Sequence, residues 1–168
     1  MKTIAEIKQL SKLRLEEAEI LCIAGKYDGA FYLAGYSVEL MLKAKICENF
    51  DMDNLFDEDA KITGIKIVRE SVKKHDLSVL LIYSGLAKKF QLAKASQLKL
   101  METYGLLIAR SNATSPNNPT SPSNQKEEKL WSEQARYLPI GSNNANDVEM
   151  LIQLLKDDEG LLEWMKNN

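Results

Sequence analysis

The chain has 168 residues, a formal net charge of −2 and 45% hydrophobic residues. This length and composition predict one globular domain over residues 1–168 and exclude general disorder. A net charge so close to zero excludes bulk attraction to nucleic acid, so RNA binding would need a local basic patch.

The ends and the cysteines point to a cytoplasmic protein. The first residues contain no apolar run of signal-peptide length, and no segment approaches the length of a membrane span. Cys22 and Cys47 fall in predicted helices and suggest no disulfide framework. We therefore expect a reduced, cytoplasmic protein without a membrane contact.

The first predicted helix runs from about Thr3 to Ala24. Thr3 and Glu6 have the spacing of a capping box, and Gly25 favours the end of the helix. Arg14 falls inside the apolar stripe of this helix. Either its stem lies on the core while its guanidinium reaches water, or it pairs with a carboxylate such as Glu39.

The second predicted helix, residues 26–46, is apolar around more than half of its circumference. This breadth predicts a central helix that at least two others cover. The remaining face carries a polar line at helical spacing, formed by Asp28, Tyr32, Tyr36, Glu39 and Lys43. We expect any function of the bundle to involve this line.

The rest of the chain predicts shorter helices. Asp76 is a good N-cap for a helix from Leu77 to Tyr83. Further helices are expected at about 61–74, 93–109 and 126–134, the last with Trp131 pointing inward, and from Asn144 to Met165 with a looser stretch at 157–160. A polar, proline-containing loop at about 111–125 is expected to be mobile. The fold class is thus all-α, an antiparallel bundle of about five main helices.

The second helix also carries a family resemblance. Its run Y-D-G-A-F-Y-L-A-G-Y-S-V-E-L-M-L-K-A resembles the second helix of HEPN domains, small helical domains that are widespread in prokaryotes. Three further pieces occur in the expected order, namely A-E-I-L-C-I-A-G, K-K-H-D-L-S-V-L-L and W-S-E-Q-A-R-Y. The resemblance implies a HEPN-like bundle that acts as a homodimer, and a nucleotidyltransferase-type partner in a toxin–antitoxin or defence system.

Many HEPN proteins are regarded as metal-independent ribonucleases, with a site formed by an Arg and a His that follows after four to six residues. The resemblance places this Arg at Arg136, but the expected His position falls on Gly141 and Ser142. Neither residue titrates near neutral pH, so the acid–base half of the motif is absent. Arg69 and His75 match the spacing formally but lie in another region, where His75 belongs to the H-D-L element.

The candidate ligand-binding residues are Tyr32, Tyr36, Glu39, Lys43, Arg136 and Tyr137. Tyrosine rings could stack on a base, and Lys43 and Arg136 could hold a phosphate. Equally, Glu39 and Lys43 could form an ordinary helix-stabilising ion pair, and Tyr137 and Trp131 could belong to the core. The sequence predicts no metal site and no cofactor, since zinc, calcium and phosphate-loop patterns are missing.

Three functional hypotheses follow. The first is a HEPN-like module without catalytic activity that binds RNA, a nucleotide or a partner protein. The second is a metal-independent endoribonuclease that uses Arg136 with a non-standard acid–base residue. The third is a structural interaction module.

Overall fold

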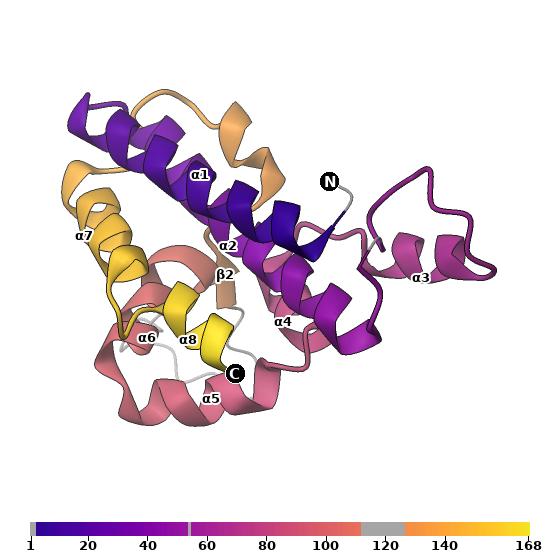
Figure 1. Cartoon of the computed structure of the whole chain (residues 1–168). Helices are drawn as coiled ribbons and strands as arrows, with labels where there is room; N and C mark the ends of the chain where they lie inside the picture. Colours follow the sequence, from indigo (N-terminus) through magenta and orange to yellow (C-terminus); the bar gives the residue numbers. More distant parts are fainter. Residues whose placement is uncertain (1–2, 54, 112–126) are drawn as a thin grey trace.

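The computed structural model describes residues 3–53, 55–111 and 127–168, and it is predominantly helical. The helices α1 (Ile4–Ile23) and α2 (Tyr27–Phe50) form an antiparallel hairpin across the molecule (Figure 1). The other α-helices are α3 (Ile65–Val72), α4 (Leu77–Tyr83), α5 (Ala87–Ser96), α6 (Leu98–Thr103), α7 (Ala145–Lys156) and α8 (Leu161–Asn167). The predicted all-α class is confirmed, although the helices are more numerous and shorter than the five main ones expected.

Local capping explains where the hairpin begins and turns. The Thr3 hydroxyl accepts from the Glu6 amide, and the Glu6 carboxylate accepts from the Thr3 amide, so the predicted capping box is present. Gly25, which follows the C-cap of α1, has φ +69°, a conformation that glycine adopts without steric cost. The chain therefore reverses directly into α2.

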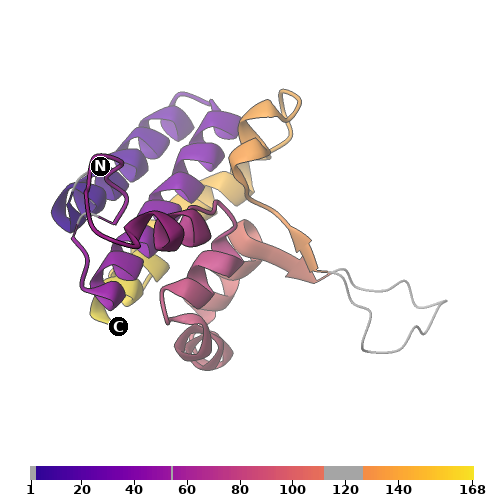
Figure 2. The ribbon, with the colours of Figure 1, turned by 90° about the vertical axis from the view of Figure 1, so that its right-hand side faces the viewer.

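The central position predicted for α2 is confirmed. This helix packs against α1, α4, α7, α8 and the 3₁₀ segment η3 (Glu133–Tyr137). Its buried apolar residues include Ala34, Val38, Leu42 and Ile46, which lie at helical spacing. Figure 2 shows α2 between α1 and the helices that follow it in the chain. The packing of α2 on several sides thus fixes the positions of the candidate residues that it carries.

The short helix α4 begins where the sequence predicted. Asp76 Oδ1 accepts from the amides of Ser78 and Val79, at 3.0 and 3.2 Å. These bonds satisfy donors that otherwise lack partners at a helix start. The side chains of Leu77, Leu80 and Leu81 are buried, so α4 and its N-cap fix the position of His75, which directly precedes Asp76.

The helix predicted over 93–109 is wrong in its extent. The backbone is extended at Gln97, where α5 ends, and the Ser96 hydroxyl donates to the carbonyl of Ala93 in the last turn. After α6 the chain widens into a π-helical segment, η1 (Tyr104–Ile108), and then forms a strand, β1 (Ala109–Ser111).

The helix predicted over 126–134 is also wrong. Glu127–Lys129 forms the strand β2, which pairs with β1 in antiparallel fashion. The pairing continues beyond the strands, because the Leu130 and Trp131 amides donate to the carbonyls of Ile108 and Leu107. A partner distant in sequence thus satisfies this backbone, which local propensity could not reveal. Most of the predicted loop at 111–125 lies outside the described residues.

The final helix predicted from Asn144 is divided into α7 and α8. Asn144 caps α7 as predicted, with its side chain accepting from the Asp147 amide at 2.9 Å. A Cβ at Gly160 would lie 2.0 Å from the Leu154 carbonyl oxygen, so the tight turn between α7 and α8 requires glycine. The stretch predicted to be looser is a complete break in the helix.

Within the part of the chain that the structure describes, no helix combines the length and apolarity needed to cross a bilayer. Cys22 and Cys47 are both buried free thiols. Burial raises the pKa of Cys47 to about 11, so this thiol is a packing residue and not a nucleophile at neutral pH.

Candidate functional site

Glu39 and Lys43 of α2 form a buried ion pair, and His75, from the segment before α4, contacts this pair from the surface. The Glu39 side chain is 1% exposed and the Lys43 side chain 6%, and Lys43 Nζ lies 2.5 Å from Glu39 Oε1. His75 Nδ1 lies 3.1 and 3.2 Å from the two carboxylate oxygens of Glu39. Buried charges are costly unless they are paired, so each of these groups depends on the others.

The cluster determines how the imidazole is oriented. A carboxylate can only accept hydrogen bonds, so the proton of a neutral His75 ring resides on Nδ1. Nε2 is then the acceptor of the ring. Because 45% of the His75 side chain is exposed, the ring joins the buried ion pair to the surface. The same hydrogen bond keeps the ring from rotating.

A surface hollow of about 520 Å³ adjoins His75. The residues that line it come from the segment before α4, from α4 itself and from the segment that leads into η3. They are Lys73, Lys74, His75, Asp76, Val79, Trp131, Ser132 and Glu133. The hollow therefore combines two exposed ammonium groups, an imidazole, a hydroxyl and two carboxylates around apolar side chains.

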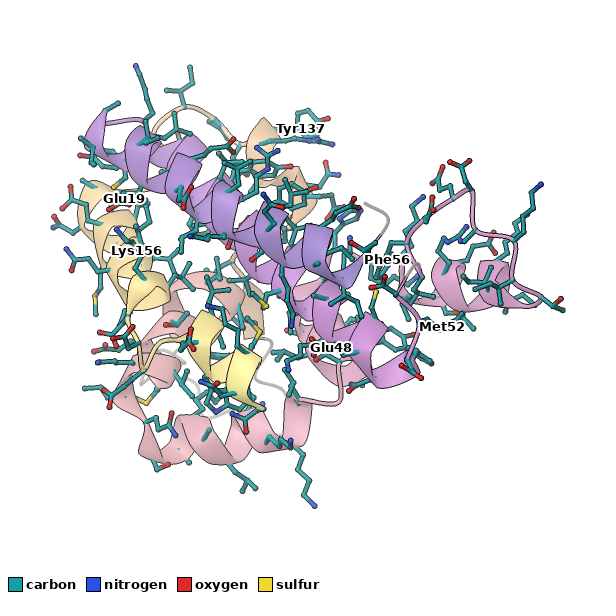
Figure 3. The ribbon with its side chains drawn as sticks, in the orientation of Figure 1. Glu19, Glu48, Met52, Phe56, Tyr137 and Lys156 are labelled. Atoms are coloured by element: carbon teal, nitrogen blue, oxygen red, sulfur yellow. The ribbon has the colours of Figure 1, made fainter. Side chains whose placement is uncertain are left out.

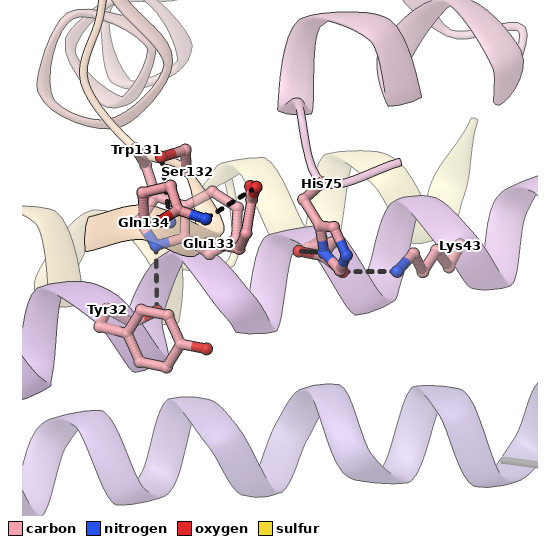
Figure 4. Close-up of polar contacts among 8 residues, drawn as sticks. Tyr32, Lys43, His75, Trp131, Ser132, Glu133 and Gln134 are labelled. Atoms are coloured by element: carbon pink, nitrogen blue, oxygen red, sulfur yellow. Dashed lines mark hydrogen bonds and ion pairs between the residues drawn. The ribbon is translucent and has the colours of Figure 1, made fainter. Parts of the chain in front are cut away.

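Trp131 forms the second wall of this hollow. Its side chain is buried as predicted, with 3% exposure, and Nε1 donates to the Tyr32 carbonyl at 3.0 Å. A Cβ at Gly35 would lie 2.2 Å from the indole ring, so the ring rests directly on the backbone of α2. Figure 4 shows Trp131 and His75 on the same side of α2, with Lys43 beside His75.

Tyr32 and Tyr36 are half-buried and pack together, with ring centroids 6.3 Å apart and an interplanar angle of 24°. Tyr32 also stacks on Trp131, again at 6.3 Å. Burial raises the pKa of Tyr36, and the nearby Glu39 charge raises it further. The Tyr36 phenol is therefore a neutral donor across the physiological range.

Arg136 and Tyr137 lie at the exposed end of η3. The Arg136 guanidinium carbon is 4.8 Å from the centroid of the Tyr137 ring, which makes a surface cation–π pair. Tyr137 is 70% exposed, so of the two alternatives considered from the sequence, a place in the core is wrong for this residue. The lining of the hollow includes neither side chain, but Ser132 and Glu133, at the start of the same segment, belong to it.

Asp28, at the other end of the polar line, holds the loop that follows η3. Its carboxylate accepts from the Gly141 amide at 2.7 Å and from the Asn143 amide and side chain at 3.0 Å. These bonds lower the pKa of Asp28, with the Gly141 amide as the largest cause. Asp28 thus positions the chain that follows the exposed Arg136–Tyr137 pair.

The two other arginines considered from the sequence have local partners. Arg69 Nε donates to the Leu55 carbonyl at 2.7 Å, and its Nη2 donates to the Asp57 carbonyl, so the guanidinium is directed to the acidic loop and not to His75. Arg14 pairs with Glu17 on its own helix. The alternative pairing of Arg14 with Glu39 is wrong, because Glu39 binds Lys43 and His75.

Sequence reasoning placed Glu39 and Lys43 together but did not connect them to His75, which is distant in sequence. It also missed Lys73, Lys74, Ser132 and Glu133. A local signal existed for the lysines, since they directly precede His75 in K-K-H-D-L. Among the described residues, no group of three or more His, Cys, Asp or Glu side chains is arranged to hold a metal ion.

No family model, curated protein or solved structure matches this chain. The HEPN resemblance therefore remains an interpretation of the sequence.

Proposed function

We propose that this protein is a HEPN-like module without catalytic activity, and that it binds RNA or a nucleotide at the hollow beside His75. The observation that carries the proposal is a half-exposed imidazole held by a buried carboxylate, next to two exposed lysines. A fixed imidazole and flexible ammonium groups are suited to phosphate oxygens.

The mixed polarity of the hollow supports a ligand that also carries hydrogen-bond donors. Asp76 accepts two amides of α4. On the other side of the hollow, the Ser132 hydroxyl accepts from the Gln134 amide at 3.2 Å and the Glu133 carboxylate accepts from the Gln134 side chain at 3.4 Å, both in exposed contacts. A carboxylate and a hydroxyl can accept from a ribose or from a base edge. Lys73 pairs with Glu58 at 2.9 Å in an exposed contact, which a phosphate could replace at little cost.

The exposed pair on η3 extends this surface. Ser132 and Glu133 lie in the hollow, and Arg136 and Tyr137 follow within one short helical segment. A single strand whose phosphate occupies the hollow could place its neighbouring base on Tyr137 and the next phosphate on Arg136. Tyr32 and Tyr36 are then supports for Trp131 and not stacking platforms.

The assembly and pathway rest on the family resemblance alone. It supports a homodimer, a nucleotidyltransferase-type partner and a role in a toxin–antitoxin or defence system. The two buried free thiols are in keeping with a reducing, cytoplasmic setting.

A metal-independent endoribonuclease is the second candidate. One observation favours it, because the segment that carries Arg136 also lines the hollow around His75. His75 would then supply the acid–base group, and Arg136 would stabilise the charge on the phosphorane. Glu39 and Tyr137 are the other residues to test for the acid–base role.

The test is to incubate the purified protein with a mixed single-stranded RNA pool, with and without EDTA. Binding is read by filter retention and cleavage on a denaturing gel. We expect retained, intact RNA, and a weakening of about tenfold in Lys73→Ala/Lys74→Ala. The exposed pair Lys88 and Lys89 on α5 is the matched control, and its double alanine variant should bind almost normally.

The other outcomes discriminate among the hypotheses. Cleavage that survives EDTA and disappears in Arg136→Ala would establish the endoribonuclease. Absence of both binding and cleavage would contradict the proposal and favour a structural interaction module.

A further inference from the structure

A second concave surface lies between α1 and α8. Both helices pack on α2, and the groove between them has a volume of about 530 Å³. Leu15, Met41, Leu155 and Leu162 give it an apolar floor. The residues around His75 do not line this groove, so its function is independent of the proposed ligand site.

The two ends of the groove differ in charge. Along α1, Lys8 and Lys12 come before Glu16 and Glu19. Lys166, on the opposite rim, lies at the same end of the groove as Lys8, and Lys45 of α2 connects the two. The Lys45 ammonium donates to the Lys166 carbonyl at 3.4 Å and pairs with Glu48 at 3.0 Å. Glu48 in turn pairs with Lys8. Glu163 pairs with Lys166 here at 2.8 Å, so the lining of this end has three lysines (Lys8, Lys12 and Lys166) and one glutamate.

The other end of the groove has more acidic than basic residues, and an ion pair joins its two rims. Glu19 of α1 pairs with Lys156 at the end of α7, and Figure 3 shows these two side chains between the helices. Asp157 and Asp158 follow Lys156 on this rim, while Glu16 lies before Glu19 on the other. Asp157 pairs with Lys99 at 2.7 Å, which leaves Asp158 and Glu16 as the more exposed acids.

We propose that this groove binds an amphipathic α-helix of a partner protein. The part of α1 from Lys8 to Glu19 is about 16 Å long, which accommodates about three turns of a helix. Two helical walls over a helical floor offer the ridges and grooves that a further helix packs against. Charge complementarity requires acidic residues on the partner at the Lys12–Lys166 end and basic residues at the Glu16–Asp158 end.

The partner helix is expected to place leucine-like side chains at positions i, i+3 or i+4, and i+7 on the floor. This spacing matches a floor that comes from four different helices. Specificity would come from the order of charges, since a helix with charges of one sign would face repulsion at one end.

The test uses the full chain and a fluorescent alanine-based peptide of about 16 residues, with three leucines at that spacing, glutamates at one end and lysines at the other. Fluorescence polarisation should show saturable binding, and a peptide with the leucines replaced by alanine should not bind. Leu15→Arg introduces a charge at the floor and should weaken binding at least about tenfold. The matched control is Ile20→Arg on the outer face of α1, where Ile20 is 65% exposed.

A second variant tests the charge order without changing the floor. The exchange Lys12→Glu/Glu16→Lys keeps an i,i+4 pair on exposed positions but reverses one rim only. The exchange reduces the difference in charge between the two ends of the groove, so binding at low salt should weaken about threefold or more. Lys73→Ala/Lys74→Ala should bind the peptide normally, which separates this surface from the RNA site.

Two results would overturn the inference. One is no saturable binding of the leucine peptide by the wild-type chain up to about 1 mM. The other is equal binding by wild type, Leu15→Arg and the charge-exchange variant, with circular dichroism confirming that each is folded.

Discussion

Two neighbouring stretches of α2 are covered in opposite ways. Around Gly35, the Trp131 ring rests on bare backbone and stacks on Tyr32, so the cover depends on shape. Just beyond it along the helix, His75 covers Glu39 and Lys43, and that cover depends on charge pairing. The hollow lies where the two covers meet. Packing fixes one wall, and an ion pair orients the other.

The comparison predicts that the charge-dependent cover is the more costly to break. Glu39→Leu leaves the Lys43 ammonium buried without its carboxylate and should lower the free energy of unfolding by about 3–5 kcal/mol. The double variant Glu39→Leu/Lys43→Leu removes both charges and should recover most of this loss. Urea denaturation measures both. A double variant as unstable as the single one would show that the loss of stability does not come from the unpaired Lys43 charge.

The shape-dependent cover is tested by Gly35→Ala. The added methyl group would lie 2.2 Å from Trp131, so the ring must move, and we expect a loss of about 1–3 kcal/mol. In a Trp164→Phe background, Trp131 is the sole indole, and its fluorescence should shift to longer wavelength.

The matched control for this change is Gly105→Ala, because a Cβ at Gly105 meets nothing within 4 Å. This variant should leave Trp131 in place and keep or slightly raise stability. Equal emission spectra for the two alanine variants would contradict the contact between the indole and Gly35.

Asp28, on the same polar face of α2, shows a third kind of contact, in which the amides of a loop donate hydrogen bonds to a carboxylate. Asp28→Asn should cost about 1 kcal/mol, because the amide accepts these hydrogen bonds less strongly. The pKa of Asp28 is lowered in the folded state, so its contribution is present above the unfolded value and is lost as the pH falls through the folded value.

The difference in stability between wild type and Asp28→Asn should therefore be constant near neutral pH and shrink below about pH 4. Thermal unfolding over this pH range measures it. A difference that grows on acidification would contradict the assignment of the hydrogen bonds.

The smallest effect is expected from an exposed ion pair of the same spacing. Lys66 and Glu70 on α3 are separated by 4.0 Å, with side chains 83% and 66% exposed. Glu70→Ala should change the free energy of unfolding by less than about 0.5 kcal/mol. A loss as large as that of Glu39→Leu would mean that burial does not distinguish the two pairs.

The sequence predicted those features that are encoded locally. The capping box at Thr3, the Asp76 cap and the apolar breadth of α2 each depend on residues within a few turns. The strand at Glu127–Lys129 could not be predicted in this way, because it pairs with β1 and a long segment of the chain separates the two strands. The same reason explains why Glu39 was associated with Lys43 and not with His75.

The solvent exposure of individual side chains was the other feature that the sequence could not predict. An i,i+4 Glu–Lys pair has the same pattern whether it faces water or the core, so the burial of Glu39 and Lys43 had no signature of its own. Likewise, Tyr137 would end a helical segment in either setting, and only the packed structure shows that its ring lies at the surface.

The most direct test of the account is the state of His75, the single histidine of the chain. A long-range ¹H–¹⁵N correlation spectrum of the tag-free protein reports which ring nitrogen carries the proton. We predict the Nδ1–H tautomer for the neutral ring, and a shift of the Nε2 signal when single-stranded RNA is added. The Nε2–H tautomer, or a ring signal that RNA leaves unchanged, would contradict the claim that Glu39 holds this imidazole toward a ligand.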